Sequence, residues 1–591
     1  MNQDSSRTSP VLQAESPTAE KTPSGINRRK FLGQAGAAAT IAAGAIASPT
    51  AAFAQSGSSH SSGRVSPPGG VQNGRVLQSF ENRVLAATQE ALIPVPPHTT
   101  NGDETRYADK SGSYSKGLLQ DGIGRVNLNA YQSMKTALAS GRPSDFENII
   151  IGGTRTLNGP QGAFAYGMEG TDAVQFGNAP SPANQESVVI VPPPPAVASA
   201  AYGTELVEMY WASLLRDVAF TDYPNNSLAN LAAQELSSMP SYAGPRNSSG
   251  QVTPALLFRG PFPGETIGPY ISQLAITPTS LGAQEMSQQM ITYLPNIDYM
   301  TDPTTWLEVQ NGIDTGLRNQ TDSQPRYLHD GRGLAALTHV DMLYQEHLTA
   351  FLVLNTLGAP LNPGNPYIHS RTQNGFGTFG QPDFAASIGE VAARALDVVW
   401  YQKWLIHLRH RPESGGGIVQ LMQTGQGNTI DAHVNNNVLN SQALASSFSK
   451  YGTYLLSQAF PEGSPTHPAY PTGHGTVGGA CITMLKFFFD GTFVIPDPQV
   501  PSDDGLSLLP YNGNDRGQIT VNGELNKLGH NISFGHGIHA GIHWRSDTDS
   551  SLILGEALAI SVLQDRAQCY NEKFTVRFTK FDGTTATISN Q

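Results

Sequence analysis

The sequence predicts a mainly α-helical protein: a large helical-bundle domain with long loops and a few short hairpins. Apolar residues recur with the helical period in several long segments: residues 76–92, 205–218, 226–238, 334–357 and 385–409. Segments that alternate between apolar and polar residues are few, and the clearest is a hairpin within residues 575–588. The 61 glycines and 41 prolines indicate long ordered loops between the helices.

The N-terminal residues are predicted to lie outside this domain. An Arg28-Arg29 pair precedes a Gly/Ala-rich apolar run that ends in a small-x-small site at Ala54, which is typical of a twin-arginine export signal. The alternative is a membrane anchor, but the run is short and rich in alanine. We therefore expect residues 1–54 to be a signal peptide of a protein exported to the periplasm or beyond, and residues 55–75 to be a flexible linker.

The composition excludes several classes of function. A formal net charge of −12 and the lack of a basic stripe argue against nucleic-acid binding. Apart from the signal, no stretch reaches the roughly 18 apolar residues of a membrane span, so no membrane anchor is predicted. The two cysteines, Cys481 and Cys569, are too few for a disulfide framework, and Cys481 lies in an apolar segment that would bury it. We expect residues 76–591 to form a single domain.

A proline-stiffened segment, HPAYPTGH at residues 467–474, leads into the apolar stretch GTVGGACITMLKFFF. This pattern predicts a buried helix that begins near Thr472. A helix start offers free N–H groups to an oxyanion. Thr472 adds a hydroxyl, Gly473 permits close approach of the backbone to a ligand, and His474 adds an imidazole for proton transfer near neutral pH. The alternative is a stiff loop with two ordinary surface histidines.

Two further segments carry side chains that suit the same site. Lys403 and Arg411 lie near the end of a predicted helix that Pro412 helps to stop, where they would converge on one anion. The alternative is a solvated basic helix end. His543 precedes Asp547 by four residues, so that on a helix the carboxylate would accept the Nδ1 proton of His543 and leave Nε2 free for a metal. Such a pair is usually structural, but the three segments together favour a site.

These motifs resemble those of the vanadium-dependent haloperoxidases and of the wider acid-phosphatase (type 2 phosphatidic acid phosphatase) superfamily. The matching residues are Lys403, Arg411-Pro412, Pro471-Thr472-Gly473-His474, and His543 with Asp547. The gap between Lys403 and Arg411 and the lead-in at His467 are similar to those of algal and cyanobacterial bromoperoxidases. The similarity extends through residues 143–225 and 325–565, with the active-site core in the second range.

The resemblance implies a role for each residue. His543 would bind vanadium through Nε2, oriented by Asp547. Vanadate oxygens would be held by four groups: Lys403, Arg411, the Thr472 hydroxyl and the Gly473 N–H. His474 would be the acid–base group. His467 stands where bromoperoxidases carry a second pocket histidine, which favours bromide or iodide over chloride.

The chain departs from the family pattern at two positions. Thr472 replaces the usual serine and keeps its hydroxyl. Gly537 stands six residues before His543, where the family carries a second oxyanion-binding arginine. The missing donor would come from His536, His539 or Arg545, or from a one-residue shift of the backbone. The loss of one charge-assisted donor would cost about 1.5–3 kcal/mol of anion affinity.

The resemblance implies vanadate-dependent oxidation of halide by hydrogen peroxide to hypohalous acid. Phosphate shares the shape and charge of vanadate and would substitute for it in the pocket. Two other functions stay open: a phosphomonoesterase with His543 as nucleophile, and a catalytically weak homologue that binds an oxyanion. By analogy with algal relatives, we also expect a homodimer.

Overall fold

The computed structural model describes residues 72–167, 171–177 and 191–591, and the part from Val76 to Gln591 forms one compact unit. The predicted signal peptide and almost all of the predicted linker lie outside the described residues, so both stay predictions. Among the helices described, none is long and apolar enough to cross a membrane.

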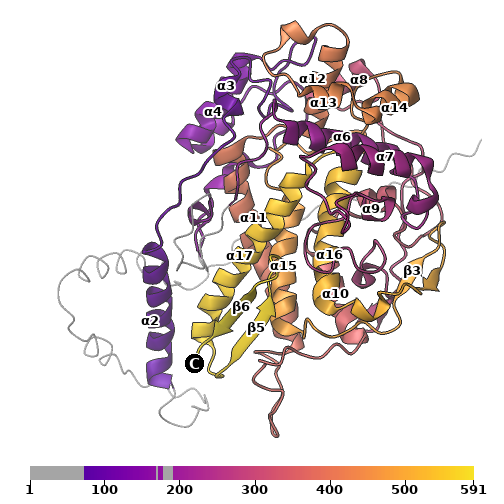
Figure 1. Cartoon of the computed structure of the whole chain (residues 1–591). Coiled ribbons are helices and arrows are strands. Elements are labelled where there is room, and N and C mark those ends of the chain that lie inside the picture. The colour runs from indigo at the N-terminus through magenta and orange to yellow at the C-terminus, as the bar shows by residue number, and fades with distance from the viewer. Residues whose placement is uncertain (1–71, 168–170, 178–190) are drawn as a thin grey trace, which may run out of the picture. The chain divides into compact units, whose positions relative to one another are not determined.

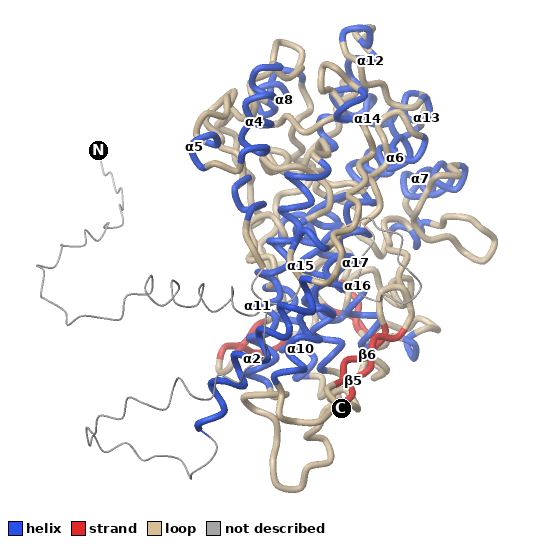
Figure 2. Tube along the Cα trace, turned by 90° about the vertical axis from the view of Figure 1, so that its left-hand side faces the viewer, coloured by secondary structure: helices blue, strands red, loops and turns tan. Residues whose placement is uncertain are grey.

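The unit is built around helix α15 (Gly473–Phe488), and every one of its 16 residues is buried. Three long helices pack against it: α11 (Gln381–Tyr401), α16 (Val521–Phe534) and α17 (Arg545–Cys569). They run side by side in Figures 1 and 2. No residue of α15 is exposed, as the apolar segment after Thr472 predicts. The polar groups predicted to bind a ligand therefore lie at its amino end, where the chain enters the core.

Other helices surround this centre. They are α2 (Gln72–Ala91), α3 (Asp103–Arg106), α4 (Leu128–Ser140), α5 (Pro143–Phe146), α6 (Ala200–Leu214), α7 (Ser227–Ser238), α8 (Pro303–Gln310), α9 (Gly331–Leu337), α10 (Gln345–Thr356), α12 (Pro412–Gln423), α13 (Asn436–Leu439) and α14 (Gln442–Tyr451). Figure 1 shows α12, α13 and α14 gathered near one end of the long helices, and β5 and β6 near the other.

The strands in the described residues form three antiparallel pairs. They are β1 (Thr279–Leu281) with β2 (Gln284–Met286), β3 (Gln499–Pro501) with β4 (Leu508–Pro510), and β5 (Thr575–Thr579) with β6 (Thr585–Ser589). The last pair is the predicted hairpin, and its turn places Gly583 at a φ of 80°. The predicted class, mainly α with a few short hairpins, is confirmed.

Three helix predictions need correction. Residues 334–357 are two helices, α9 and α10, separated by a turn at 338–344. The helix predicted at 205–218 begins earlier, at Ala200, and ends at Leu214. The helix predicted at 385–409 is α11, which begins earlier, at Gln381, and ends at Tyr401.

The region around Pro412 also differs from the prediction. Helix α11 continues into a π-helical turn, η7 (Gln402–His407), which ends at Leu408 with a φ of 43°. Pro412 does not stop this helix but occupies the first position of α12, where its missing N–H costs nothing. Lys403 therefore lies in the π turn, and Arg411 is the residue immediately before α12.

Helices α15 and α17 touch through their backbones. A Cβ at Gly479 would overlap the carbonyl oxygen of Leu552, and a Cβ at Gly555 would overlap that of Thr476. Glycine at both positions allows the first half of α17 to pack closely against α15, and this contact helps to set the distance between the amino ends of the two helices.

We expect Gly555→Ala to lower the free energy of unfolding by about 3 kcal/mol, because the added methyl group meets a backbone atom that cannot rotate away. In Gly389→Ala, on α11, the new Cβ meets no atom within 4 Å. This control is expected to be stabilised by about 0.5–1 kcal/mol, because alanine is the better helix residue. Urea titration of both variants measures the difference, and equal effects at the two sites would contradict the backbone contact.

Candidate active site

The amino end of α15 is uncapped. Thr472 is its N-cap residue, but the Thr472 side chain makes no capping hydrogen bond. Its Oγ1 is buried without any hydrogen-bond partner among the described residues. A buried hydroxyl without a partner costs free energy, and the first N–H groups of a helix carry partial positive charge. This end of α15 therefore suits an anion.

Two cations lie beside it. The Lys403 ammonium is fully buried and donates to the backbone carbonyls of Pro468 and Ala469, at 2.8 and 2.7 Å. The Arg411 guanidinium is also fully buried and donates from Nε to the His467 carbonyl at 2.9 Å. Both cations therefore form hydrogen bonds to the segment that leads into α15. Neither forms an ion pair with a described carboxylate.

His543 lies between Arg411 and Asp547. Its Nδ1 lies 2.9 Å from the Asp547 carboxylate and so carries the proton, which leaves Nε2 as the acceptor. Arg411 Nη1 donates to this Nε2 at 2.8 Å. Contrary to prediction, His543 is not on a helix: it lies in the turn before α17, and Asp547 reaches back to it from the first turn of that helix.

His474 is held by a carboxylate that the motif analysis did not assign. Its Nε2 lies 2.9 and 3.0 Å from the two carboxylate oxygens of Asp341, in the turn between α9 and α10. Both side chains are almost fully buried. Nε2 therefore donates to Asp341, and Nδ1 is the ring atom available to move a proton. The sequence signal was an acidic residue within an apolar segment, because the break between α9 and α10 was not predicted.

The charges of the site are uncompensated. Burial lowers the pKa of Lys403, and the neighbouring Arg411 lowers it further. Burial likewise lowers the pKa of Arg411 to about 10. The pKa of His543 is lowered by burial and then by both cations. Positive charge is thus unfavourable here until an anion enters, and an oxyanion fits the donors present.

A buried network of ion pairs is connected to the site through Asp547. Arg409 pairs with Asp547 at 2.6 Å and with Glu205 at 3.0 Å, and Arg545 pairs with Glu208. Glu205 and Glu208 lie one helical turn apart on α6, in an otherwise apolar and fully buried stretch. The motif analysis did not assign these residues roles, although two acidic residues on an apolar helix were a signal that buried cations face them.

The structure brings all eight predicted site residues to one place. They are Lys403, Arg411, His467, Thr472, Gly473, His474, His543 and Asp547, and we call them the oxyanion cluster. His467 accepts from Arg411 Nη2 at 3.0 Å, and its ring packs against Trp400 with centroids 4.9 Å apart. Gly473 opens α15, and a Cβ there would first meet Leu343 and Trp400 at 3.7 Å.

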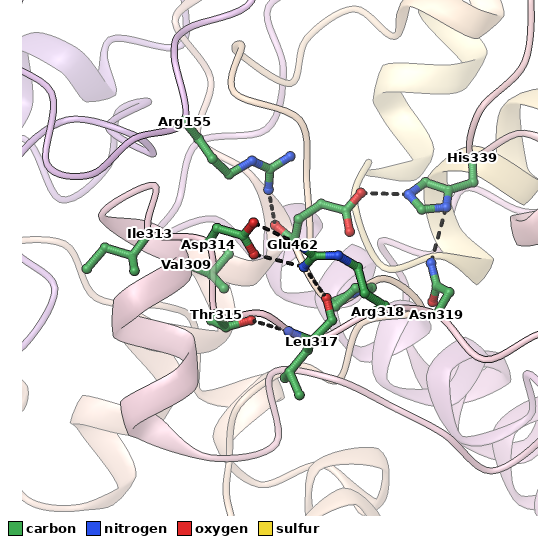
Figure 3. Close-up of a pocket in the computed structure, with 11 residues that line it drawn as sticks. Arg155, Val309, Ile313, Asp314, Thr315, Leu317, Arg318, Asn319, His339 and Glu462 are labelled. Carbon is green, nitrogen blue, oxygen red and sulfur yellow. Dashed lines mark hydrogen bonds and ion pairs between the residues drawn. The ribbon is translucent and has the colours of Figure 1, made fainter. Parts of the chain in front are cut away.

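A different cleft, of about 330 Å³, lies near His339 (Figure 3). None of the oxyanion cluster lines it. Its charged groups neutralise one another: Arg318 pairs with Asp314 at 2.9 Å, and His339 bonds to Glu462 at 2.6 Å. Arg155, which also lines the cleft, donates to the Glu462 backbone carbonyl at 3.3 Å. The two arginines and two carboxylates of the cleft balance in formal charge, unlike the two cations of the oxyanion cluster, which have no carboxylate partner.

Comparison with known proteins gives a consistent result. No protein-family model matches the chain. A vanadium-dependent bromoperoxidase of Ascophyllum nodosum is 33% identical over 537 residues, covering 86% of this chain and 92% of that protein. Those of Corallina officinalis and Corallina pilulifera are each 30% identical over 604 residues, covering 87% of this chain and 98% of theirs.

A solved structure is also similar. It is the homohexameric second vanadate-dependent bromoperoxidase of Ascophyllum nodosum, which superposes with a TM-score of 0.82 at 27% identity. The match covers 92% of this chain and 96% of that one. The similarity therefore spans most of the chain.

Proposed function

The chain belongs to the vanadium-dependent bromoperoxidases, and on this premise we propose that it oxidises bromide in preference to chloride. It is an enzyme that oxidises halide with hydrogen peroxide in a vanadate-dependent reaction: halide + H2O2 + H+ → HOX + H2O. The names of its relatives support bromide. His467 supports it too, since the resemblance associates a histidine at this position with bromoperoxidases.

The oxyanion cluster fits vanadate because two buried cations without carboxylate partners lie beside the uncapped start of α15. Lys403, Arg411, the Thr472 hydroxyl and the Gly473 N–H would hold the oxygens, and His543 Nε2 would bind the metal. Bound vanadate supplies a Lewis acid that activates hydrogen peroxide. The protein supplies the donors to the anion. Arg411 Nη1, which donates to His543 Nε2 at 2.8 Å, would turn to an oxygen of the anion when the metal takes its place at Nε2.

His474 would move the proton. Asp341 fixes Nε2–H as the donor within the pair, so Nδ1 is the base that takes a proton from hydrogen peroxide. Both side chains are almost fully buried, so water does not compete for the hydrogen bond that keeps this orientation. Asp547 does the same for His543, holding its Nδ1–H and leaving Nε2 basic.

The test is bromination of a phenol dye by purified protein with hydrogen peroxide and bromide, before and after addition of orthovanadate. We expect activity that requires both vanadate and peroxide, and a lower rate with chloride than with bromide. No oxidation of bromide or iodide at any pH, with vanadate present, would contradict the function. Equal rates with chloride and bromide would contradict the halide preference alone.

We predict that Lys403→Met separates anion binding from folding. The methionine removes a buried charge but also leaves two carbonyls without a donor, so we expect the free energy of unfolding without anion to change by less than about 1 kcal/mol. Affinity for vanadate is expected to fall about ten-fold or more, because one charge-assisted donor is lost. Calorimetric titration with orthovanadate and urea unfolding measure the two effects. Unchanged affinity would contradict the contact with the anion.

We propose that the protein assembles with copies of itself through α2. Three residues of α2 spaced by four, Val76, Phe80 and Val84, form one apolar stripe and are 81%, 57% and 47% exposed. Such a stripe on an exposed helix is costly in water and is typical of an interface. The similar bromoperoxidase of known structure is a homohexamer, which supports a second copy of the chain as the occupant of this face.

We expect the double variant Phe80→Glu/Val84→Glu to have a lower mass in solution than the wild type, because it places two charges on the stripe. Light scattering during gel filtration measures the mass. Glu81→Gln, on the same helix, is the control and is expected to keep the wild-type mass. A monomeric wild type, or an unchanged mass in the double variant, would contradict assembly through this face.

We also propose that the protein is exported by the twin-arginine pathway, on the evidence of the sequence alone. Mature protein from the native host is expected to begin at Gln55, which mass spectrometry of the N-terminus detects. Replacement of the Arg28-Arg29 pair by lysines is expected to retain the protein in the cytoplasm. A native N-terminus upstream of Arg28 would contradict the proposal.

A further inference from the structure

The histidine at position 536 lies inside the oxyanion site. Its ring stacks on that of His474 with centroids 3.8 Å apart and lies 5.8 Å from the ring of His543. It is almost fully buried. Among the groups that lower its pKa, after burial, are His474, His543 and Arg411, so it shares the positive environment of the cluster.

A π-helical turn explains why residue 536 faces the site. Between α16 and His543 the chain forms η10 (Gly535–His539), in which Ile542 N–H donates to the Gly537 carbonyl, five residues back, at 2.8 Å. This turn changes the register of the side chains. A Cβ at Gly537 would lie 3.1 Å from the Cβ of His543, so there is little room for a larger residue at 537.

The two other candidate donors are committed elsewhere. His539 Nε2 lies 3.0 Å from the Tyr270 hydroxyl, in an aromatic part of the core. Arg545 donates to the Glu208 carboxylate from Nε at 2.9 Å and to the Arg259 carbonyl at 3.0 Å. Neither side chain is available to the oxyanion cluster.

The hydrogen bonding of His536 fixes which nitrogen is free. Its Nδ1 lies 3.0 Å from the Thr338 carbonyl, which only accepts, so Nδ1 carries the proton. Nε2 makes no hydrogen bond to any residue that the structure describes. Thr338 lies three residues before Asp341, so one short turn holds both stacked imidazoles, His536 through a carbonyl and His474 through a carboxylate.

We propose that His536 is an anion-binding residue of this site, whose Nε2 would contact an oxygen of the bound vanadate. The inference rests on the proposed function. The family pattern places an arginine in contact with the anion at the position where this chain has Gly537, and we assign that contact to His536. The π turn brings His536 into the site in its place. With Nδ1–H bound to Thr338, neutral His536 accepts from a protonated oxygen of the anion.

The test is the dissociation constant of orthovanadate, and of inorganic phosphate as a redox-inert probe, measured by calorimetry on the full mature chain. His536→Ala is expected to weaken both about ten-fold or more, since a buried polar contact to a charged group is lost. His536→Arg is expected to bind within about three-fold of the wild type, because guanidinium donates to oxyanions. The exposed His433→Ala is the matched control and is expected to bind as the wild type does.

Dissociation constants for His536→Ala within about two-fold of the wild type would overturn the inference, as would His536→Arg binding as weakly as the alanine variant. Either result would assign the ring a packing role against His474. Circular dichroism checks the fold, and His536→Asn replaces the alanine variant if the latter unfolds, with the same expected weakening. A wild type that binds neither anion would overturn the proposed function itself, which separates the two failures.

Discussion

Replacing His543 with alanine is expected to abolish bromide oxidation, lowering the rate at least about 1,000-fold even with excess vanadate. In the proposed site His543 Nε2 would bind the metal, and Asp547 holds the ring in the required tautomer. In the variant the cations remain, so the oxyanion is still attracted but is no longer fixed to the protein by a bond. Dye bromination measures the rate, and vanadium analysis after gel filtration measures retention.

A control for His543→Ala must show that the loss of any histidine does not by itself lower the activity. His433 is exposed and bonds only to the Gly427 carbonyl among the described residues, so His433→Ala is expected to keep full activity. If His543→Ala retained more than about a tenth of the wild-type rate, or held vanadium after gel filtration as well as the wild type does, His543 would not be the metal ligand.

The sequence predicted those site residues that lie close together in the chain and form a recognisable pattern of residue types. Thr472, Gly473 and His474 are adjacent and start an apolar segment, so a buried helix end with polar groups followed directly from the pattern. Lys403 and Arg411 were found from their charge in an apolar setting. That argument held although the helix geometry behind it was wrong: the two residues lie in a π turn and before α12, not along one helix.

Partners distant in sequence were beyond such reasoning. Asp341 reaches His474 across 133 residues, and Glu205 reaches Arg409 across 204. An acidic residue in an apolar segment indicates that a buried partner exists, but nothing local identifies that partner, because it is a base or cation elsewhere in the chain. These contacts are decided by which helices pack together, and periodicity alone does not specify packing.

The sequence left the replacement for the arginine missing at Gly537 undecided for a different reason. Counting six residues back from His543, as the resemblance to the family implies, places this glycine at the position of the arginine and suggests a missing donor. The π turn in η10 shifts the register, so His536 faces the site instead. A π turn has no reliable sequence signature, and the shift was therefore one of several alternatives until the structure placed the ring.

We expect His474→Ala to lower the bromination rate about 100- to 10,000-fold while leaving vanadate bound, because the proposed function makes His474 a proton-transfer group and not a metal ligand. This is the reverse of His543→Ala, which is expected to lose the cofactor. The rate at saturating peroxide and bromide gives the loss, and calorimetric titration with orthovanadate gives the affinity. A variant that lost affinity and rate in proportion would assign His474 to anion binding alone.

Asp341→Asn refines the same test. The asparagine keeps the shape of the side chain but removes the charge that holds Nε2–H of His474, so we expect a smaller loss, about ten- to 100-fold. If Asp341 acts only through His474, adding Asp341→Asn to His474→Ala should cost nothing more, because the group it positions is already gone. Additive losses in the double variant would instead mean that the carboxylate supports the turn at 338–341, and with it the Thr338 carbonyl that holds His536.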